Sequence, residues 1–379
     1  MRKINTFFLR VASRCNMVCD YCYVFRHRDM SWKLYPKCMT KHTIEIFARR
    51  LRDYVIKNNI NEVNIIFHGG EPLIIGEDVL IEYCDKINDY IDKYAKVFFS
   101  LQTNGTLISE KFLKECVKRN IGISLSIDGP KEIHDKNRRY ASGEGTFSRV
   151  IESIELLKKY PQIFEGVIGV IDPFSKPSEV LGFFNEYGLQ NIDLLLPDST
   201  YLDLPKDREK NESLYSDWLT EAFNSWFNNY QNIHFRTFEY ILSAVLGIQN
   251  SLDAFGLGEL DYLTIETDGS YHTSDILKIT YENASALGMN LNDSSIEEAL
   301  ENKKVKEYNR YLLWDNLPEK CKKCEVSNIC GGGSLAHRYS IENGFNNPTV
   351  YCNEMYELIN YAKKCIEEEI NKEIIYDRK

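Results

Sequence analysis

The chain has 379 residues, 43% of them hydrophobic and 27% charged, an ordinary globular composition that allows more than one domain. It holds no run of about 18 apolar residues and no secretory signal pattern, so a membrane-spanning or exported protein is excluded and the cytoplasm is the expected compartment. The net charge of −10 argues against a nucleic-acid partner, and eleven cysteines predict reduced thiols that bind metals or clusters.

Short apolar runs alternate with helix-like stretches through roughly the first 200 residues. The predicted strands are Thr6–Val11, Val63–Phe67, Val97–Leu101, Ile121–Ile127, Gly166–Ile171 and Ile192–Leu196. The predicted helices include Thr43–Lys57, Ile81–Tyr94, Glu110–Arg119 and Thr146–Lys159. Six strand–helix repeats imply parallel strands with helices outside. Six are too few to close an eight-stranded barrel, so we expect an α/β fold, a partial (β/α)6 TIM barrel, with its functional residues at the carboxyl ends of the strands.

The pattern changes in the second half of the chain. An aromatic-rich stretch, Tyr215–Ile248, is predicted to be helical, and LTIETDGSYHT is predicted to be a hairpin that turns at Asp268–Gly269. The terminal segment Glu354–Ile374 is predicted to be an amphipathic helix. We therefore expect a barrel domain over residues 1–235 and a second domain over residues 236–379.

Two cysteine clusters have the spacing of ligand sets. Near the N-terminus, Cys15, Cys19 and Cys22 are spaced C-x3-C-x2-C directly after the first predicted strand. Three thiolates are one short of the four that a [4Fe–4S] cluster normally uses, which would leave one iron open to a small molecule. Zinc, with His27 as a fourth ligand, is the alternative.

The second cluster lies near the C-terminus and supplies four thiols, Cys321, Cys324, Cys330 and Cys352, with three glycines after the third cysteine. Four thiolates can ligate a [4Fe–4S] cluster completely or hold a structural zinc ion. The remaining cysteines are predicted to be small buried residues on helices: Cys38, Cys84, Cys116 and Cys365.

Polar or glycine-rich motifs follow the predicted strands. The second strand is followed by His-Gly-Gly-Glu-Pro, in which Gly70 allows close approach of a ligand and Glu71 can accept a bond from an ammonium group. The third and fourth strands end near Asn104 and Ser126, and Arg138 lies in the run HDKNRR. A planar guanidinium there suits a carboxylate.

The first cysteine motif together with the Gly-Gly-Glu-Pro motif resembles the radical S-adenosylmethionine (SAM) enzymes. The resemblance implies that Cys15, Cys19 and Cys22 hold the SAM-binding [4Fe–4S] cluster. It implies SAM contacts by these residues: Tyr21, Gly70, Glu71, Asn104, Ser126 and Arg138. We place Arg138 ahead of Arg139 because it keeps the spacing of the family's H-D-x-x-R motif, and Leu195 is a further prediction for a contact near the adenine.

The C-terminal cysteines resemble the SPASM domain, which usually holds two auxiliary [4Fe–4S] clusters. Two ligand positions of that pattern are serines here, Ser274 and Ser334. The resemblance therefore implies one auxiliary cluster, fully ligated by Cys321, Cys324, Cys330 and Cys352, and hence an electron relay or a structural staple. Two [4Fe–4S] clusters and SAM are the expected cofactors.

The segments ETDGSYHTSDILK and CGGG…HRYS…NGFNNPTVYC most resemble the cyclophane-forming radical SAM/SPASM peptide maturases, which are related to the anaerobic sulfatase-maturating enzymes. The implied substrate is a ribosomally made precursor peptide, in which an aromatic ring carbon is joined to a nearby Cβ. The implied catalytic base is Asp275, whereas His272 is expected to be a strand-face side chain. A flavodoxin or ferredoxin is the expected electron donor.

Three alternatives remain open. Within the same class, the enzyme could form thioethers in peptides or oxidise a sulfatase Cys or Ser to formylglycine. In another class, it could be a zinc-binding interaction protein without catalysis. Iron content after anaerobic reconstitution separates the enzyme from the zinc protein, and the identity of the modified substrate separates the enzymes from one another.

Overall fold

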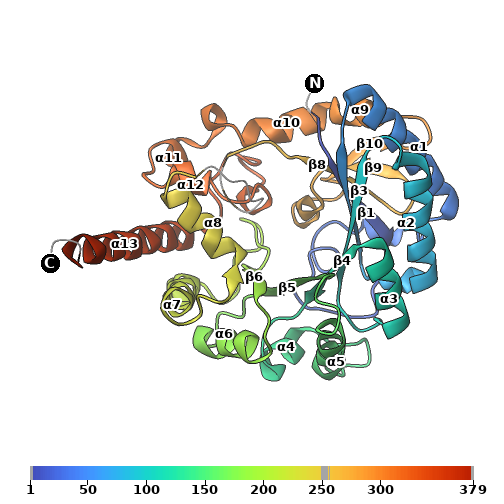
Figure 1. The fold of residues 1–379 in the computed structure, drawn as a ribbon. Helices are drawn as coiled ribbons and strands as arrows, with labels where there is room; N and C mark the ends of the chain where they lie inside the picture. Colours follow the sequence, from blue (N-terminus) through green and yellow to red (C-terminus); the bar gives the residue numbers. More distant parts are fainter. Residues whose placement is uncertain (1–2, 249–254, 256, 377–379) are drawn as a thin grey trace. The chain divides into compact units, whose positions relative to one another are not determined.

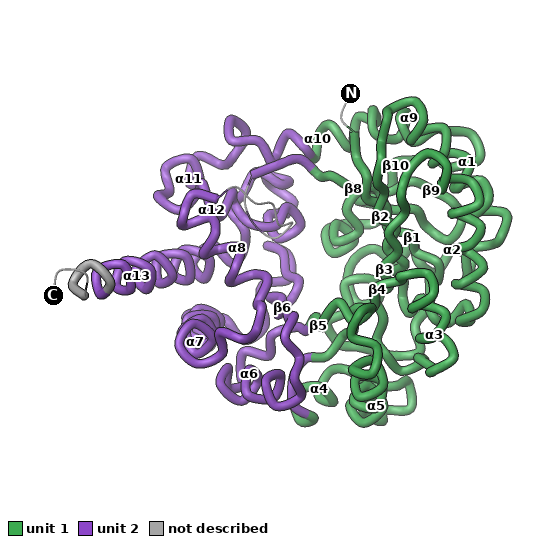
Figure 2. Tube along the Cα trace, viewed as in Figure 1, with its two compact units in different colours: residues 1–127, 131–168, 260–308 green, residues 128–130, 169–259, 309–379 purple. Residues whose placement is uncertain are grey.

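The computed structural model describes residues 3–248, 255 and 257–376. The chain forms two compact units, which Figure 2 shows in green and purple. Unit 1 consists of residues 1–127, 131–168 and 260–308, and unit 2 consists of residues 128–130, 169–259 and 309–379. This division follows backbone packing, and it does not test the domain boundary expected after residue 235.

Unit 1 is built on a mostly parallel sheet. Its strands follow the order β10-β9-β8-β1-β2-β3-β4-β5. The parallel strands are β1 (Thr6–Ala12), β2 (Glu62–Gly69), β3 (Lys96–Thr103), β4 (Ile121–Ser126) and β5 (Phe164–Val170). Strand β8 (Tyr262–Ile265) pairs in parallel with β1 and turns back into β9 (Ser270–His272), which is followed by antiparallel β10 (Ala286–Asn290).

The helices of unit 1 begin and end at residues that favour those positions. Thr40 and Ser109 cap α1 and α3 by accepting a backbone N–H three residues on, and Asn59 and Asn120 follow them in the left-handed conformation. The helices are α1 (Lys41–Asn58), α2 (Glu77–Ile91), α3 (Glu110–Arg119), α4 (Lys131–Asn137), α5 (Phe147–Leu157), α9 (Ile296–Leu300) and α10 (Lys303–Tyr311). Short 3-10 turns are η1 (Ser31–Lys33), η2 (Pro72–Ile75) and η3 (Asp275–Ile279).

The core of unit 1 lies between these helices and the sheet. In β2, alternate residues Val63, Ile65 and Phe67 are fully buried, and α1, α2 and α3 lie along the outer side of the strands (Figure 1). Parallel strands alternating with outer helices are the arrangement expected of a partial barrel, so the α/β fold class is confirmed. All six predicted parallel strands are present, β6 (Asn191–Leu195) being the sixth.

Unit 2 is mostly helical. Besides β6 and the short β7 (His234–Phe235), its elements are α6 (Pro177–Glu186), α7 (Leu214–Asn229), α8 (Arg236–Val245), η4 (Trp314–Asn316), α11 (Glu319–Lys322), α12 (Ser327–Cys330), η5 (Ala336–Arg338) and α13 (Cys352–Tyr376). The long α13 confirms the predicted terminal helix. Within the described part of the chain, no helix is both long and apolar enough to pass through a membrane.

Two details differ from the sequence-based expectations. The stretch Tyr215–Ile248 is not one helix, because a turn and β7 separate α7 from α8, and the Trp226 indole N–H donates to Ile233 O across this break at 2.7 Å. Cys38 does not lie on a helix but forms an isolated bridge with Ala12. The hairpin is confirmed, with Gly269 at φ +83° in its turn.

Candidate active site

The three cysteines of the first motif lie on the loop that leaves the carboxyl end of β1. Within this loop the Cys22 N–H donates to Cys19 O over 3.3 Å, and the Arg26 N–H donates to Cys22 O over 2.9 Å. Burial raises the pKa of Cys15 to about 12, opposed by the Met17 N–H and increased by the neighbouring Cys19 and Cys22 thiols. The three sulfur atoms are thus near enough to influence one another.

The glycines after β2 fit against this loop. A Cβ on Gly69 would lie 2.2 Å from Ala12 O, and a Cβ on Gly70 would lie 2.2 Å from Arg14 O. The Gly70 N–H donates to Ala12 O, and the Glu71 N–H donates to Arg14 O. The glycines therefore allow two chain segments to touch, which is a reason for them that the sequence did not reveal.

Glu71 is a buried carboxylate at the centre of these strand ends. Its Oε1 accepts from Leu73 N–H (3.0 Å) and Thr103 Oγ1–H (2.7 Å), and its Oε2 accepts from Asn104 N–H (2.8 Å). Burial raises the pKa of Glu71 to about 7, although these hydrogen bonds oppose the shift. A carboxylate has about four acceptor positions, so one more donor can bind.

Asn104 connects the end of β3 to the cysteine loop. Its Nδ2 donates to Asn16 Oδ1 at 2.9 Å and reaches Cys15 Sγ at 3.7 Å. Its Oδ1 accepts from the backbone and side chain of Thr106. At the end of β4, Ser126 Oγ accepts from Gln102 Nε2 at 3.0 Å.

Arg138 follows α4 and is buried beside the same loop. Its guanidinium lies 5.4 Å from the ring centroid of Tyr21. Burial raises the pKa of Cys22, and the charge of Arg138 is one of the groups that oppose this shift. By contrast, the side chain of Arg139 is 41% exposed and pairs with Asp20 at 3.1 Å. The structure thus brings Tyr21, Arg138 and Cys22 together.

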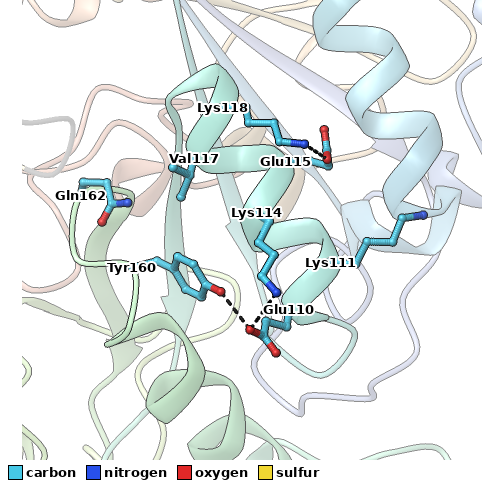
Figure 3. Close-up of a pocket in the computed structure, with 8 residues that line it drawn as sticks. All are labelled: Glu110, Lys111, Lys114, Glu115, Val117, Lys118, Tyr160 and Gln162. Atoms are coloured by element: carbon cyan, nitrogen blue, oxygen red, sulfur yellow. Dashed lines mark hydrogen bonds and ion pairs between the residues drawn. The ribbon is translucent and has the colours of Figure 1, made fainter.

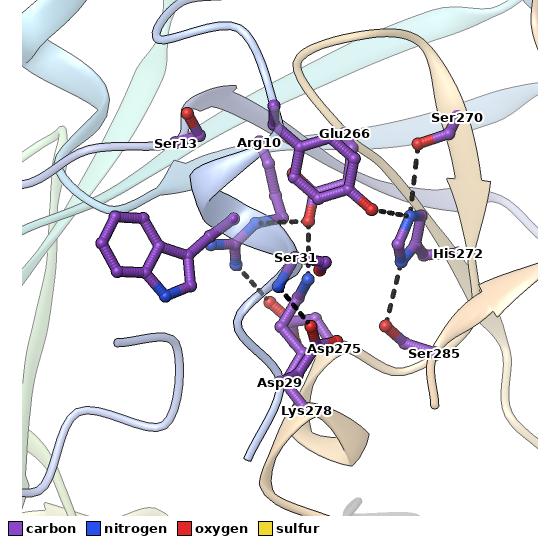
Figure 4. A network of polar contacts seen from close by, with 12 residues as sticks. Arg10, Ser13, Asp29, Ser31, Glu266, Ser270, His272, Asp275, Lys278 and Ser285 are labelled. Atoms are coloured by element: carbon purple, nitrogen blue, oxygen red, sulfur yellow. Dashed lines mark hydrogen bonds and ion pairs between the residues drawn. The ribbon is translucent and has the colours of Figure 1, made fainter. Parts of the chain in front are cut away.

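Asp275, the predicted base, begins η3 and lies in a buried polar network (Figure 4). Its Oδ2 accepts from Arg10 Nη1 at 2.7 Å and from the Tyr23 hydroxyl at 2.8 Å. Arg10 also pairs with Glu266 at 3.1 Å, and Glu266 pairs with Lys278 at 2.9 Å. Two cations and two carboxylates therefore balance inside unit 1.

The network fixes the charge of each group. Burial alone would raise the pKa of Asp275, but the charge of Arg10 and the hydrogen bond from the Tyr23 hydroxyl hold it below its ordinary value. Burial would also raise the pKa of Glu266, and Arg10 and Lys278 bring it instead to about 2. Burial lowers the pKa of His68 to about 4, so this imidazole is neutral near pH 7. Asp275 is thus ionised and able to accept a proton.

The hairpin also places His272 and Ser274. His272 is buried and lies within hydrogen-bond distance of Tyr35 Oη (3.2 Å) and Ser285 Oγ (2.9 Å), as expected of a strand-face residue. Ser274 is 4% exposed, and its Oγ accepts from the Tyr262 hydroxyl at 2.7 Å. A hydrogen-bonded hydroxyl therefore lies where the SPASM pattern would have a cysteine.

The second thiol set lies in unit 2. Cys321 is on α11, Cys324 follows it, Cys330 ends α12 and Cys352 begins α13. Burial raises the pKa of Cys330 to about 12, and the other three thiols add to the increase. The four thiols of the set therefore belong to one local region of unit 2.

A glycine triplet shapes the loop between Cys330 and Cys352. Gly331, Gly332 and Gly333 have φ of +57°, +83° and +74°, which side chains disfavour. A Cβ on Gly333 would lie 2.6 Å from Thr349 Cγ2, and Thr349 N–H donates to Gly332 O. The segment before Cys352 can therefore pack against the loop after Cys330.

Each thiol set supplies the number of ligands that its predicted cofactor needs. Three half-buried thiols beside Glu71 and Arg138 match a SAM-binding cluster, and four thiols match a complete ligand set. A bound cluster deprotonates its thiols, which reverses the effect of burial on their pKa. Among the described residues, no group of three His, Cys, Asp or Glu side chains has the arrangement that would hold a single metal ion.

A hollow on α3 is not part of this site. It is lined by exposed side chains of α3, including Lys114 and Lys118, together with Tyr160 and Gln162 (Figure 3). Glu110 pairs with Lys114 at 3.1 Å and accepts from Tyr160 at 3.1 Å, so these groups satisfy one another at the surface. No cysteine or predicted cofactor contact is present there.

Several residues of the network around Asp275 were not predicted from the sequence. Arg10, Glu266 and Lys278 carry charge inside apolar segments, FFLRVA and LTIETDG among them, and that contrast is the signal that could have identified them. Tyr23 directly follows Cys22, the last cysteine of the motif, and gave no signal of its own.

Comparison with known proteins agrees with this geometry. A model of the radical SAM superfamily matches residues 9–173. A cysteine-type anaerobic sulfatase-maturating enzyme of Clostridium perfringens is 30% identical over 370 residues, covering 93% of this chain and 94% of that protein. A serine-type enzyme of Bacteroides thetaiotaomicron is 23% identical over 352 residues, covering 87% and 82%. The structure of native anSMEcpe with bound AdoMet and Cp18Cys peptide matches with a TM-score of 0.81 at 27% identity, covering 97% of this chain and 99% of that one.

Fold and site together define a class of βα enzymes with a three-cysteine loop after the first strand and a Gly-Gly-Glu turn after the second. The chain belongs to the radical SAM superfamily and shares a family with the anaerobic sulfatase-maturating enzymes. Membership of the superfamily implies a [4Fe–4S] cluster and SAM as cofactors. The second half, SPASM-like as expected, is covered by the same structural match.

Proposed function

We propose that this enzyme closes a cyclophane ring in a ribosomally made precursor peptide by joining the Cβ of one residue to a ring carbon of a nearby aromatic side chain. A peptide substrate is supported by the peptide bound in the related anSMEcpe structure. The observation that carries the cyclophane assignment is the ligand set in the SPASM-like second half of the chain. Four thiols of one set are present there, whereas the hydrogen-bonded Ser274 occupies a position at which the SPASM pattern has a further cysteine.

The proposed site assigns a task to each group of residues. Cys15, Cys19 and Cys22 hold the first cluster, and the SAM contacts are those predicted from the sequence: Tyr21, Gly70, Glu71, Asn104, Ser126 and Arg138. The four cysteines of unit 2 hold an auxiliary cluster. When bound, the first cluster and SAM would supply a 5′-deoxyadenosyl radical, which abstracts a hydrogen atom from the substrate. The auxiliary cluster would supply a one-electron acceptor.

Asp275 acts on the peptide after hydrogen abstraction. The Cβ radical adds to the aromatic ring, and the ring regains aromaticity by losing one proton and one electron. The ionised carboxylate of Asp275 takes the proton, since Arg10 and Tyr23 keep it deprotonated at neutral pH. A flavodoxin or ferredoxin is the proposed source of the electron that starts each cycle.

Oxidation of a sulfatase Cys or Ser to formylglycine is the second proposal, favoured by the near full-length similarity to the cysteine-type enzyme. It needs the same hydrogen abstraction and the same base. The two proposals differ in the product, because formylglycine has a reactive aldehyde whereas a cyclophane has a new carbon–carbon bond and no carbonyl.

Anaerobic co-expression with the short peptide encoded beside the enzyme's own gene tests the proposal. We expect a peptide that has lost two hydrogens, resists backbone fragmentation between the joined residues and does not react with a hydrazide probe. Serine oxidation also removes two hydrogens, so the probe is essential. A hydrazide-reactive product from a sulfatase peptide would support the second proposal, and an unmodified peptide despite active SAM cleavage would contradict the first.

A further inference from the structure

Arg338 is a buried cation that the proposed reaction does not use. It ends η5 of unit 2 and is 0% exposed. Its Nε donates to Phe345 O (3.2 Å) and Asn347 O (3.0 Å), and its Nη1 donates to Tyr311 O (2.9 Å). In the described part of the chain no carboxylate pairs with Arg338, and its buried Nη2 has no hydrogen-bond partner.

A guanidinium charge removed from water is costly unless an anion compensates for it. The thiols of Cys321 and Cys330 are the cysteine groups that interact electrostatically with Arg338. Its side chain also lies along the glycine triplet, because a Cβ on Gly332 would be 3.5 Å from Nη1. The missing anion is therefore to be sought at the four thiols.

We propose that Arg338 faces the iron–sulfur cluster held by the four thiolates of unit 2, and that its charge and its unpaired Nη2 raise the reduction potential of that cluster. This inference rests on the proposed function only in assuming a cluster at these thiols. Reduction adds one negative charge to the site, so a fixed buried cation stabilises the reduced form. Arg338 thus makes the site a better electron acceptor.

A redox titration followed by EPR tests this proposal on the reconstituted full chain. Replacing Cys15, Cys19 and Cys22 with Ala leaves the auxiliary cluster as the one observed. In that background we expect Arg338→Gln to lower the reduced-to-oxidised ratio at a fixed potential about tenfold, which is a shift of about 59 mV for a one-electron couple. Arg338→Lys keeps the charge and should shift the potential less.

Lys320→Gln is the matched control. Lys320 is also a cation beside the thiol set, near Cys352, but it is exposed, so solvent screens its charge. We expect a smaller shift for Lys320→Gln than for Arg338→Gln. Equal shifts for the two variants, or no shift for Arg338→Gln, would overturn the proposal.

A measurement on protein that keeps Arg338 tests the proposal even if the Arg338→Gln variant does not fold. When the arginine side chains carry ¹⁵N, pulsed EPR of the reduced auxiliary cluster should detect a nitrogen coupling. Absence of that coupling, or a site that takes up zinc and no iron, overturns the proposal. Neither measurement uses the peptide, so a failed crosslinking assay leaves the result intact.

Discussion

Asp275 shows how neighbouring side chains fix the charge and the direction of a single residue. Its Oδ2 receives both the Arg10 and the Tyr23 hydrogen bonds, while Glu266 and Lys278 complete the balance of charge behind Arg10. A carboxylate held in this way is ionised and fixed in direction. An ionised carboxylate of fixed direction is what the proposed role of proton acceptor requires.

Asp275→Asn should separate SAM cleavage, which it leaves intact, from formation of the modified peptide, which it impairs. We expect modified peptide to fall by about 10²–10⁴-fold, the usual contribution of a general base, while 5′-deoxyadenosine is still released. Both products are quantified in the same assay. Asp29→Asn is the control, because Asp29 is a buried carboxylate that accepts from the Ser31 N–H and has no hydrogen bond or ion pair with Asp275. An equal fall in both products would indicate a structural role for Asp275.

Arg10→Met should be strongly destabilising. It leaves Glu266 and Asp275 buried without their shared cation, and such broken buried pairs lower the free energy of unfolding by about 3–5 kcal/mol. Urea unfolding of the metal-free chain measures the effect. Arg139→Met is the matched control, since it removes an exposed pair with Asp20 and should change the free energy by less than about 1 kcal/mol.

The acid sensitivity of unit 1 should depend on Glu266. Its pKa falls from an ordinary 4.5 to about 2, so its stabilisation is complete above pH 4.5 and is lost as the pH falls toward 2. The shift corresponds to a loss on the order of 3 kcal/mol. Unfolding measured between pH 6 and pH 2 should show a flatter decline for Glu266→Gln than for the wild type. Parallel declines would contradict this account.

At the scale of elements, the contact between the loop after β1 and the turn after β2 organises the first cluster. Gly69 and Gly70 lie against the backbone of Ala12 and Arg14 with no room for a side chain. Glu71 and Asn104 then extend the contact to β3. The strand ends therefore form one connected structure around the three thiols.

Gly70→Ala should disrupt this structure. The new Cβ would lie 2.2 Å from Arg14 O. Because that oxygen belongs to the backbone and cannot rotate away as a side chain can, one of the two loops must move. We expect the iron content to fall by about four per chain, through loss of the first cluster. Gly182→Ala is the control, since the nearest atom to its new Cβ is Tyr230 Oη at 3.4 Å, and its iron content should be unchanged.

At the scale of the whole molecule, two separate thiol sets in two compact units predict two independent clusters. We expect about eight irons per anaerobically reconstituted chain and about four after either set is replaced by Ala. Iron analysis and Mössbauer spectroscopy provide the measurement. Zinc at the unit 2 set together with about four irons would show that the auxiliary site is structural.

The sequence predicted the parallel strands, the hairpin and both thiol sets, because hydrophobic period, Asp268–Gly269 and cysteine spacing are local signals. It did not predict the pairing of Arg10 with Asp275, since these residues are 265 positions apart and meet through tertiary structure. The break between α7 and α8 was missed for a similar reason, because the Trp226 contact that fixes it depends on packing. The partners of Arg338 lie at the end of α10 and in the loop that holds Phe345 and Asn347, and their pairing left no pattern in the sequence.

The close fit of Gly70 against Arg14 also has a consequence for engineering. A cysteine loop grafted alone from a relative would arrive without the turn shaped to receive it, and a transplanted turn would lack its matching loop. Chimeras that exchange both segments as a single cassette should retain iron, whereas those that exchange one should lose it.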